Sequence, residues 1–213
     1  MEAASGKIKY LGNIPAAPKR EMILSRLGYR NGVTELNDSD MLLIEEAIKQ
    51  GSCLCKPEGA YLFVPVSSRS DSGIILDNGM SFQSRNLSKL LGESYSVVLM
   101  AATVGREVTE KVSNEVEKGD AAKGLIIDSV ASQTADAALD WIVSLLDKIL
   151  AREGRRLTRH RYSPGFGDLP LCYQKDIFEA LRLDSLDMAL TEKFMLVPEK
   201  SVIAIAGVEE RRI

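Results

Sequence analysis

The sequence has few of the residues that build disulfide frameworks and metal sites. Three cysteines and one histidine, His160, occur among its 213 residues. An odd cysteine count, in a chain whose N-terminus does not resemble a secretion signal, argues against a disulfide framework. Cys53 and Cys55 flank a single residue and no second pair completes four ligands, so we do not expect a structural zinc site. A single histidine also excludes a histidine-rich metal centre.

Excess charge and long apolar runs are absent as well. The formal net charge is -3 and the sequence pI is about 5.4, so electrostatics give no reason to expect nucleic acid or a membrane surface as a partner. No stretch reaches the roughly 18 apolar residues of a membrane-spanning helix. We therefore expect a soluble, cytoplasmic protein. Its 45% of hydrophobic residues suffice for the core of one domain, or of two small ones.

Hydrophobic periodicity and turn residues predict helices and strands that mix without regular βαβ repetition. We expect helices over residues 19–27, 38–50, 87–91, 107–118, 120–153 and 173–183, and strands over residues 61–66, 73–76, 94–102, 159–161, 195–197 and 201–206. The class is therefore α+β, with a mixed, largely antiparallel sheet, flanking helices and one long helix. We expect a single domain over residues 1–213, with N-terminal helices and a hairpin in residues 1–90 and the core in residues 91–213.

The long helix over residues 120–153 has an unusual polar face. Its apolar stripe runs from Ile126 to Ile149 at helical spacing, which predicts burial along its length. Beside the stripe, polar residues recur at helical intervals among small side chains: Ser129, Gln133, Asp136 and Asp140. Small side chains let a ligand approach the helix, and an acceptor such as Asp136 could hold an amino group or a ribose hydroxyl. The alternative is a solvated face on a helix that packs elsewhere through its alanines.

A loop that follows a basic segment carries the most informative residues. Arg159 and Arg161 have the period-two spacing of a strand with both guanidinium groups on one face. The loop itself reads Arg161-Tyr162-Ser163-Pro164-Gly165-Phe166-Gly167-Asp168-Leu169-Pro170. An arginine fixed by a strand suits a carboxylate, glycines let backbone groups approach a ligand, and Phe166 could lie against an adenine ring or a neighbouring chain. A small-molecule loop and a structural turn with a salt-bridged arginine both fit these residues.

Two sequence blocks connect the chain to a known family. The pattern Arg161-x-x-Pro164-Gly165-Phe166-x-x-x-Pro170 resembles the Arg-x-x-Pro-Gly-Tyr signature of the activation domain of cobalamin-dependent methionine synthase. A second block, Leu190-Thr191-Glu192-x-Phe194 followed by Pro198-x-x-Ser201-Val202, is similar to the closing segment of that family. The resemblance covers residues 161–202, and the long helix takes the place of the family's helix before the signature. We find no counterpart for residues 1–90.

The resemblance implies that the loop binds S-adenosylmethionine and that its arginine meets the methionine carboxylate. The residues expected to bind the ligand are those of the signature and one acidic residue of the long helix: Arg161, Tyr162, Ser163, Pro164, Gly165, Phe166 and Asp136. The family usually has tyrosine where Phe166 stands. Any hydrogen bond from that hydroxyl is therefore absent here, although stacking on the ring could survive.

The resemblance also implies a function in trans. The family's cobalt-binding motif, Asp-x-His-x-x-Gly, is absent, because His160 lies in Thr158-Arg-His-Arg-Tyr-Ser163. The chain also lacks a cysteine-rich zinc site and has no room for a folate barrel. It therefore resembles an activation module that works on the cobalamin of a separate methionine synthase, as an accessory to methionine biosynthesis. Such a module presents the methyl group of S-adenosylmethionine to cob(II)alamin, and a flavodoxin- or ferredoxin-like donor supplies one electron.

Two alternatives stay open. The chain could be a non-catalytic interaction module that kept the fold and lost the ligand, or it could reactivate another corrinoid methyltransferase. An ordinary methyltransferase acting alone is disfavoured, because no Gly-x-Gly-x-x-Gly loop follows a strand near the N-terminus. Calorimetric titration with S-adenosylmethionine separates a ligand-binding module from an interaction module.

Overall fold

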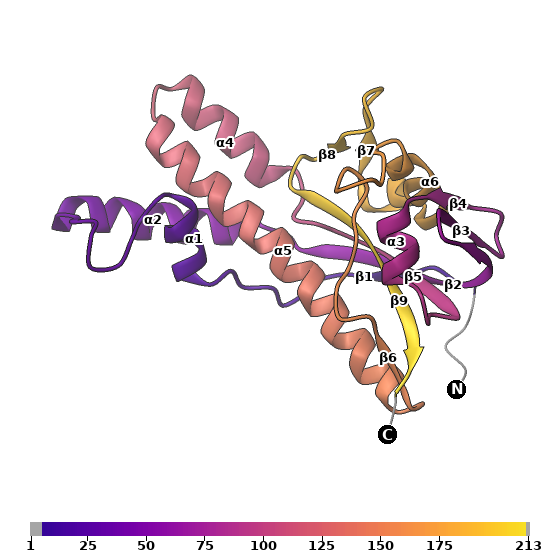
Figure 1. Cartoon of the computed structure of the whole chain (residues 1–213). Helices are drawn as coiled ribbons and strands as arrows, with labels where there is room; N and C mark the ends of the chain where they lie inside the picture. Colours follow the sequence, from indigo (N-terminus) through magenta and orange to yellow (C-terminus); the bar gives the residue numbers. More distant parts are fainter. Residues whose placement is uncertain (1–5, 212–213) are drawn as a thin grey trace.

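Among residues 6–211, which the computed structural model describes, seven strands form one antiparallel sheet (Figure 1). Its order is β4-β3-β2-β5-β9-β6, and β1 pairs with β2. The strands are β1 (Lys9–Leu11), β2 (Glu58–Ser70), β3 (Gly73–Leu76), β4 (Ser81–Gln83), β5 (Ser96–Thr103), β6 (Arg155–Leu157) and β9 (Ser201–Glu210). A two-stranded hairpin consists of β7 (Ala189–Leu190) and β8 (Leu196–Val197).

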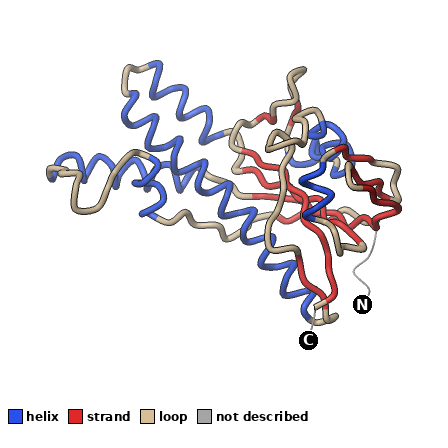
Figure 2. Tube along the Cα trace, viewed as in Figure 1, coloured by secondary structure: helices blue, strands red, loops and turns tan. Residues whose placement is uncertain are grey.

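Helices lie on both faces of the sheet and extend beyond it (Figures 1 and 2). They are α1 (Arg20–Arg26), α2 (Asp38–Leu54), α3 (Arg85–Leu90), α4 (Glu107–Glu117), α5 (Ala121–Ala151), α6 (Tyr173–Leu181) and the short 3-10 helix η1 (Leu183–Leu186). The second half of α5 packs on one face of the sheet. Helices α3, α6 and η1 pack on the other face.

The central strand β5 is buried along its whole length. Alternate side chains of a strand point to opposite faces of the sheet. Val97, Leu99 and Ala101 accordingly join the core beneath α3 and α6. Val98 and Met100 join the core beneath α5. A continuous apolar run therefore fits a strand that is covered on both sides, as the sequence predicted for residues 94–102.

Helices α1, α2 and α4 pack with the first half of α5 in a lobe that projects away from the sheet (Figures 1 and 2). The prediction that α2 stops before Gly51 was wrong, because the helix continues to Leu54. A Cβ atom at position 51 would lie 3.1 Å from the Cβ atom of Val130 on α5. This glycine therefore allows α2 to approach α5 closely and does not end the helix.

The predicted fold class is confirmed: the chain is α+β, with an antiparallel sheet, flanking helices and one long helix, α5, of 31 residues. Because β2 pairs with β5 along eight residues, segments from both sides of position 90 build the same sheet. No helix within residues 6–211 is long and apolar enough to span a membrane.

Candidate functional site

The segment before the signature loop is bent, and the prediction of a strand over residues 159–161 was wrong. The strand β6 ends earlier, and the chain turns at residues 159–160. Thr158 causes the turn. Its hydroxyl donates to the carbonyl of His160 at 2.9 Å and accepts from the amide of Gly207 at 3.0 Å. A side chain thus takes a hydrogen bond that a regular ladder would give to the backbone.

The chain rejoins the sheet at Tyr162, which fixes the start of the loop. Its amide and carbonyl each pair with Ile205 of β9 at 2.8 Å. Arg161 and Tyr162 are consecutive residues, and their side chains go to opposite faces of the sheet. Arg161 forms an ion pair with Asp140 of α5, whereas the Tyr162 ring lies with Asn86 of α3. The ion pair places the guanidinium group against the long helix.

The acidic residue that meets the signature arginine is Asp140. Asp136, which the sequence pointed to as an acidic residue that binds the ligand, is exposed one helical turn away, about 6 Å along the axis. Among the described residues, Asp136 takes part in no ion pair. Both carboxylates lie on the same side of α5, because residues four apart share a face. Of the polar face of α5, Asp136 and Asp140 are exposed, whereas Ser129 is buried and Gln133 half-buried. Arg161 lies against the exposed part of this face.

The signature loop is a compact turn with a buried base and an exposed tip. Pro164 and Leu169 are buried, and the amide of Gly165 donates to the carbonyl of Leu169 at 2.8 Å. The tip is open: Phe166 has 69% of its surface exposed. Gly165 has a φ of +94°, which a residue with a side chain rarely adopts. The loop thus presents backbone and an aromatic ring to solvent on a fixed base.

Aspartate 168 joins this loop to α3, a role that the sequence interpretation missed. The Asp168 carboxylate accepts from the amides of Arg85 at 2.7 Å and Asn86 at 3.2 Å, and from the hydroxyl of Ser84. These bonds, that from Ser84 first, hold the pKa of Asp168 below its usual range. Ser84 also accepts from the amide of Leu87 as the helix cap. The sequence does show a serine that could cap a short helix. It does not show that this serine binds Asp168, which lies 84 residues further along the chain.

The second sequence block forms the hairpin β7–β8 and the start of β9. At the hairpin tip, the amide of Thr191 donates to the carbonyl of Met195 at 2.9 Å, and the Thr191 hydroxyl accepts from the Met195 amide at 3.0 Å. The Ser201 hydroxyl donates to the hydroxyl of Thr103 at 2.8 Å, linking β9 to β5. These residues shape the end of the sheet.

The three cysteines form no disulfide with one another. Cys53 and Cys172 are exposed and Cys55 is half-buried, and all three are free thiols. Burial raises the pKa of the Cys55 thiol to about 11, against the smaller effect of a hydrogen bond with Thr134. Within residues 6–211 no group of three His, Cys, Asp or Glu residues could hold a metal ion.

Comparison with known proteins gives a likeness in fold but none in sequence. No protein-family model and no curated protein matches the sequence. The crystal structure of the MetH reactivation domain bound to AdoHcy is similar, with a TM-score of 0.73 and 15% sequence identity. The match covers 99% of this chain and 81% of that chain. The chain shares the fold of the MetH reactivation domain. At this identity the likeness establishes the fold alone.

The match to the MetH reactivation domain extends beyond the region of sequence resemblance. Residues 1–90 have no recognisable counterpart in sequence, yet the structural match covers 99% of the chain. The N-terminal helices and β2 therefore belong to the same architecture. The fold match does not test which residues bind a ligand, so the residues of the signature loop and Asp136 stay predictions.

Proposed function

We propose that this chain binds S-adenosylmethionine at residues 161–166 and reactivates the cob(II)alamin of a separate cobalamin-dependent methionine synthase by reductive methylation. The main support is the likeness of the whole fold to a reactivation domain whose crystal structure has AdoHcy bound. AdoHcy is S-adenosylmethionine without the transferable methyl group. The signature loop adds support, because it is exposed at its tip and carries the arginine that the proposal needs.

The charges beside the loop fit the amino-acid end of this ligand, which carries a carboxylate and an ammonium group. A guanidinium group has five N–H donors, and Arg161 directs its Nη1 to Asp140. The other N–H groups would donate to the ligand carboxylate, for which a planar guanidinium group is well suited. Asp140 and Asp136 supply negative charge for the ammonium group.

The loop tip fits the other end of the ligand. Gly165 and Phe166 are exposed, so a flat adenine ring would reach the backbone and the aromatic ring together. Pro164 is buried and holds the tip in place. Tyr162 is a positioning residue in this arrangement, because its backbone is bonded to β9 and its ring lies on the opposite face.

The chain acts by positioning. S-adenosylmethionine supplies a methyl group, cobalamin belongs to the partner protein, and a flavodoxin- or ferredoxin-like protein would supply an electron. The described residues hold the donor at an exposed loop, where a docked partner can reach it. Orientation of two reactants can lower a barrier by several kcal/mol, about 7–11 in favourable cases. No general acid or base of this chain is required.

Calorimetric titration tests the ligand. Wild-type protein should bind S-adenosylmethionine, and Arg161→Ala should weaken binding by about 2–3 kcal/mol, as expected for a charge-assisted contact. Arg152→Ala is the matched control, because Arg152 is an exposed arginine at the end of α5 outside the site. Equal affinity of wild type and Arg161→Ala, with both proteins folded, would remove Arg161 from the site.

A non-catalytic interaction module is the second candidate, favoured by phenylalanine at position 166 where the family usually has tyrosine. It predicts no heat of binding with S-adenosylmethionine for the wild-type protein. A corrinoid methyltransferase other than methionine synthase remains an alternative partner for the ligand-binding module, and reactivation assays with each enzyme distinguish the two.

A further inference from the structure

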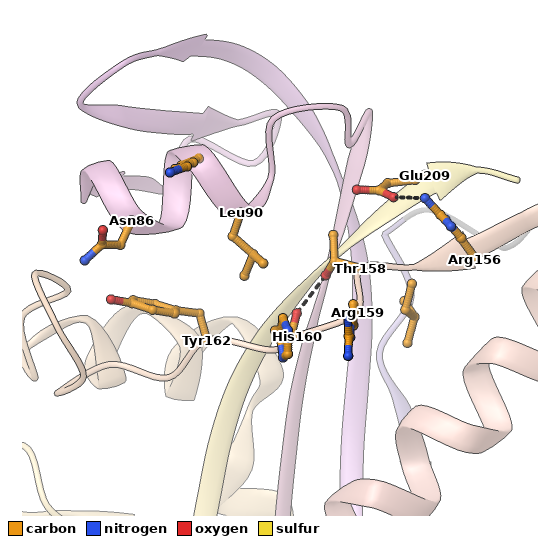
Figure 3. Close-up of a pocket in the computed structure, with 10 residues that line it drawn as sticks. Asn86, Leu90, Arg156, Thr158, Arg159, His160, Tyr162 and Glu209 are labelled. Carbon is orange, nitrogen blue, oxygen red and sulfur yellow. Dashed lines mark hydrogen bonds and ion pairs between the residues drawn. The ribbon is translucent and has the colours of Figure 1, made fainter. Parts of the chain in front are cut away.

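A hollow of about 830 Å³ opens between α3 and residues 156–162 (Figure 3). It includes the Tyr162 side chain, whereas the Arg161 side chain goes to the other face of the sheet and pairs with Asp140 of α5. Neither partner of that ion pair lines the hollow, and neither do residues 163–166. The proposed function therefore leaves it unused. Its volume is in the range of small-molecule sites, roughly 300–1,000 Å³.

Three cationic side chains lie on one part of the wall of the hollow. Lys89 of α3 and Arg159 both line it, and within residues 6–211 neither is part of an ion pair. Arg156 also lines it and is bound to Glu209 at 3.1 Å. Glu209 is the one carboxylate in the lining, so two cations stay uncompensated. Such a wall attracts an anion.

Apolar surface forms the other part of the wall. The Tyr162 ring lines the hollow from the side of residues 156–162, and Asn86 and Leu90 line it from α3 (Figure 3). A half-buried aromatic ring next to a leucine side chain offers a flat contact for a ring or another apolar group. The Asn86 amide can donate and accept hydrogen bonds at the same place.

We propose that this hollow is a second binding site, for a small amphipathic anion with a flat or apolar body and a phosphate or carboxylate group. Lys89 and Arg159 would supply positive charge for the anionic group, and the body would lie against Tyr162 and Leu90. The cationic and apolar parts of the wall each account for one part of the ligand. The site does not depend on S-adenosylmethionine, so it stands or falls separately from the proposed function.

Uridine 5′-monophosphate is a suitable probe, because it joins a flat ring to a phosphate and lacks an adenine. In an NMR titration of the full chain, we expect saturable shifts at the amides of Lys89, Leu90, Thr158 and Tyr162. Uridine should bind at least about tenfold more weakly, because charge-assisted bonds are lost. Inorganic phosphate should also bind more weakly, because it lacks the ring. If phosphate binds as tightly as the nucleotide, or the shifts lie at residues 163–166, the assignment is wrong.

Paired substitutions locate the anion. Lys89→Ala with Arg159→Ala should weaken nucleotide binding by about tenfold or more. Lys148→Ala with Arg152→Ala removes the same charge from the exposed end of α5 and should leave the affinity unchanged. Equal losses in the two double variants would mean that net charge alone attracts the nucleotide, and the proposed site would be refuted. A carboxylate probe, orotate, distinguishes a site for carboxylates from a site that requires phosphate.

Discussion

At the scale of single residues, Gly167 shows how closely the signature loop folds back on Tyr162. Gly167 has a φ of +54°, and a Cβ atom there would lie 2.1 Å from the Tyr162 hydroxyl oxygen. The left-handed backbone costs a residue with a side chain about 1–2 kcal/mol. The contact with Tyr162 adds a steric cost, since real atoms do not approach this closely. Glycine is therefore required here for two separate reasons.

Gly167→Ala should lower the free energy of unfolding by about 2 kcal/mol or more, from backbone strain and from the collision with the tyrosine hydroxyl. Adding Tyr162→Phe removes the oxygen, so the double variant should be more stable than the sum of the single effects predicts. Chemical denaturation of the four proteins measures this coupling. Strict additivity would show that the two side chains do not meet.

Phe166 tests whether the loop tip is open. Because 69% of its surface is exposed, Phe166→Tyr should change the free energy of unfolding by less than about 0.5 kcal/mol. Phe82→Tyr is the contrasting control, because Phe82 is fully buried and an unpaired buried hydroxyl costs about 1–3 kcal/mol. Comparable destabilisation by the two substitutions, measured by thermal unfolding, would place Phe166 in the core.

At the scale of elements, α3 and the signature loop are joined through Asp168, and this link depends on pH. Its pKa is lowered in the folded protein, chiefly by the hydrogen bond from Ser84. A group with a depressed folded pKa stabilises the fold above its unfolded pKa, about 3.9 for aspartate, and loses this effect as pH falls through the folded pKa. Acid should therefore weaken this link between the loop and α3.

Asp168→Ala should lower the unfolding temperature at pH 7, and the difference from wild type should narrow as the pH falls below about 4. Asp71→Asn is the control: Asp71 lies in an exposed turn, and its side chain forms no ion pair within residues 6–211. It should show no such pH dependence. A difference between wild type and Asp168→Ala that stays constant from pH 7 to pH 3 would contradict the role of the carboxylate.

The local sequence pattern predicted most helices and strands, but it did not predict which residues they contact. The apolar run at residues 94–102 and the helical spacing through residues 120–153 correspond to β5 and α5, because burial leaves its period in the sequence. Residues 159–161 do not form a strand, because the Thr158 hydroxyl captures backbone groups. The ion pair of Arg161 with Asp140 depends on which turn of α5 faces the arginine, and periodicity carries no information on that.

At the scale of the whole molecule, α5 covers one face of the sheet, and α3, which is bonded to the signature loop through Asp168, covers the other. The fold class could be predicted because turns and apolar runs alternate without βαβ repetition. The packing of the N-terminal helices against α5 could not be predicted, because contacts through Gly51 and small residues of α5 have no distinctive sequence pattern. The whole chain nevertheless resembles the MetH reactivation domain in fold.

The proposed function predicts that the chain works only together with a cobalamin protein. Purified alone, it should bind no cobalamin tightly and methylate no homocysteine, because the Asp-x-His-x-x-Gly motif is absent. Docking should be modest in affinity, since the cobalamin must also reach its other substrates between rescues. Stoichiometric corrinoid in the purified chain would contradict this expectation.

Reactivation in trans is the most direct measurement. A cobalamin-loaded methionine synthase without its own activation domain is oxidised to the cobalt(II) state and mixed with this chain, S-adenosylmethionine and a low-potential electron donor. Recovery of activity should require all three additions, and Arg161→Ala should abolish it at limiting S-adenosylmethionine while Arg152→Ala does not. The physical reason is that docking converts a rare encounter between donor and acceptor into an oriented one. Failure to restore activity, despite demonstrated binding of S-adenosylmethionine, would contradict the proposed function.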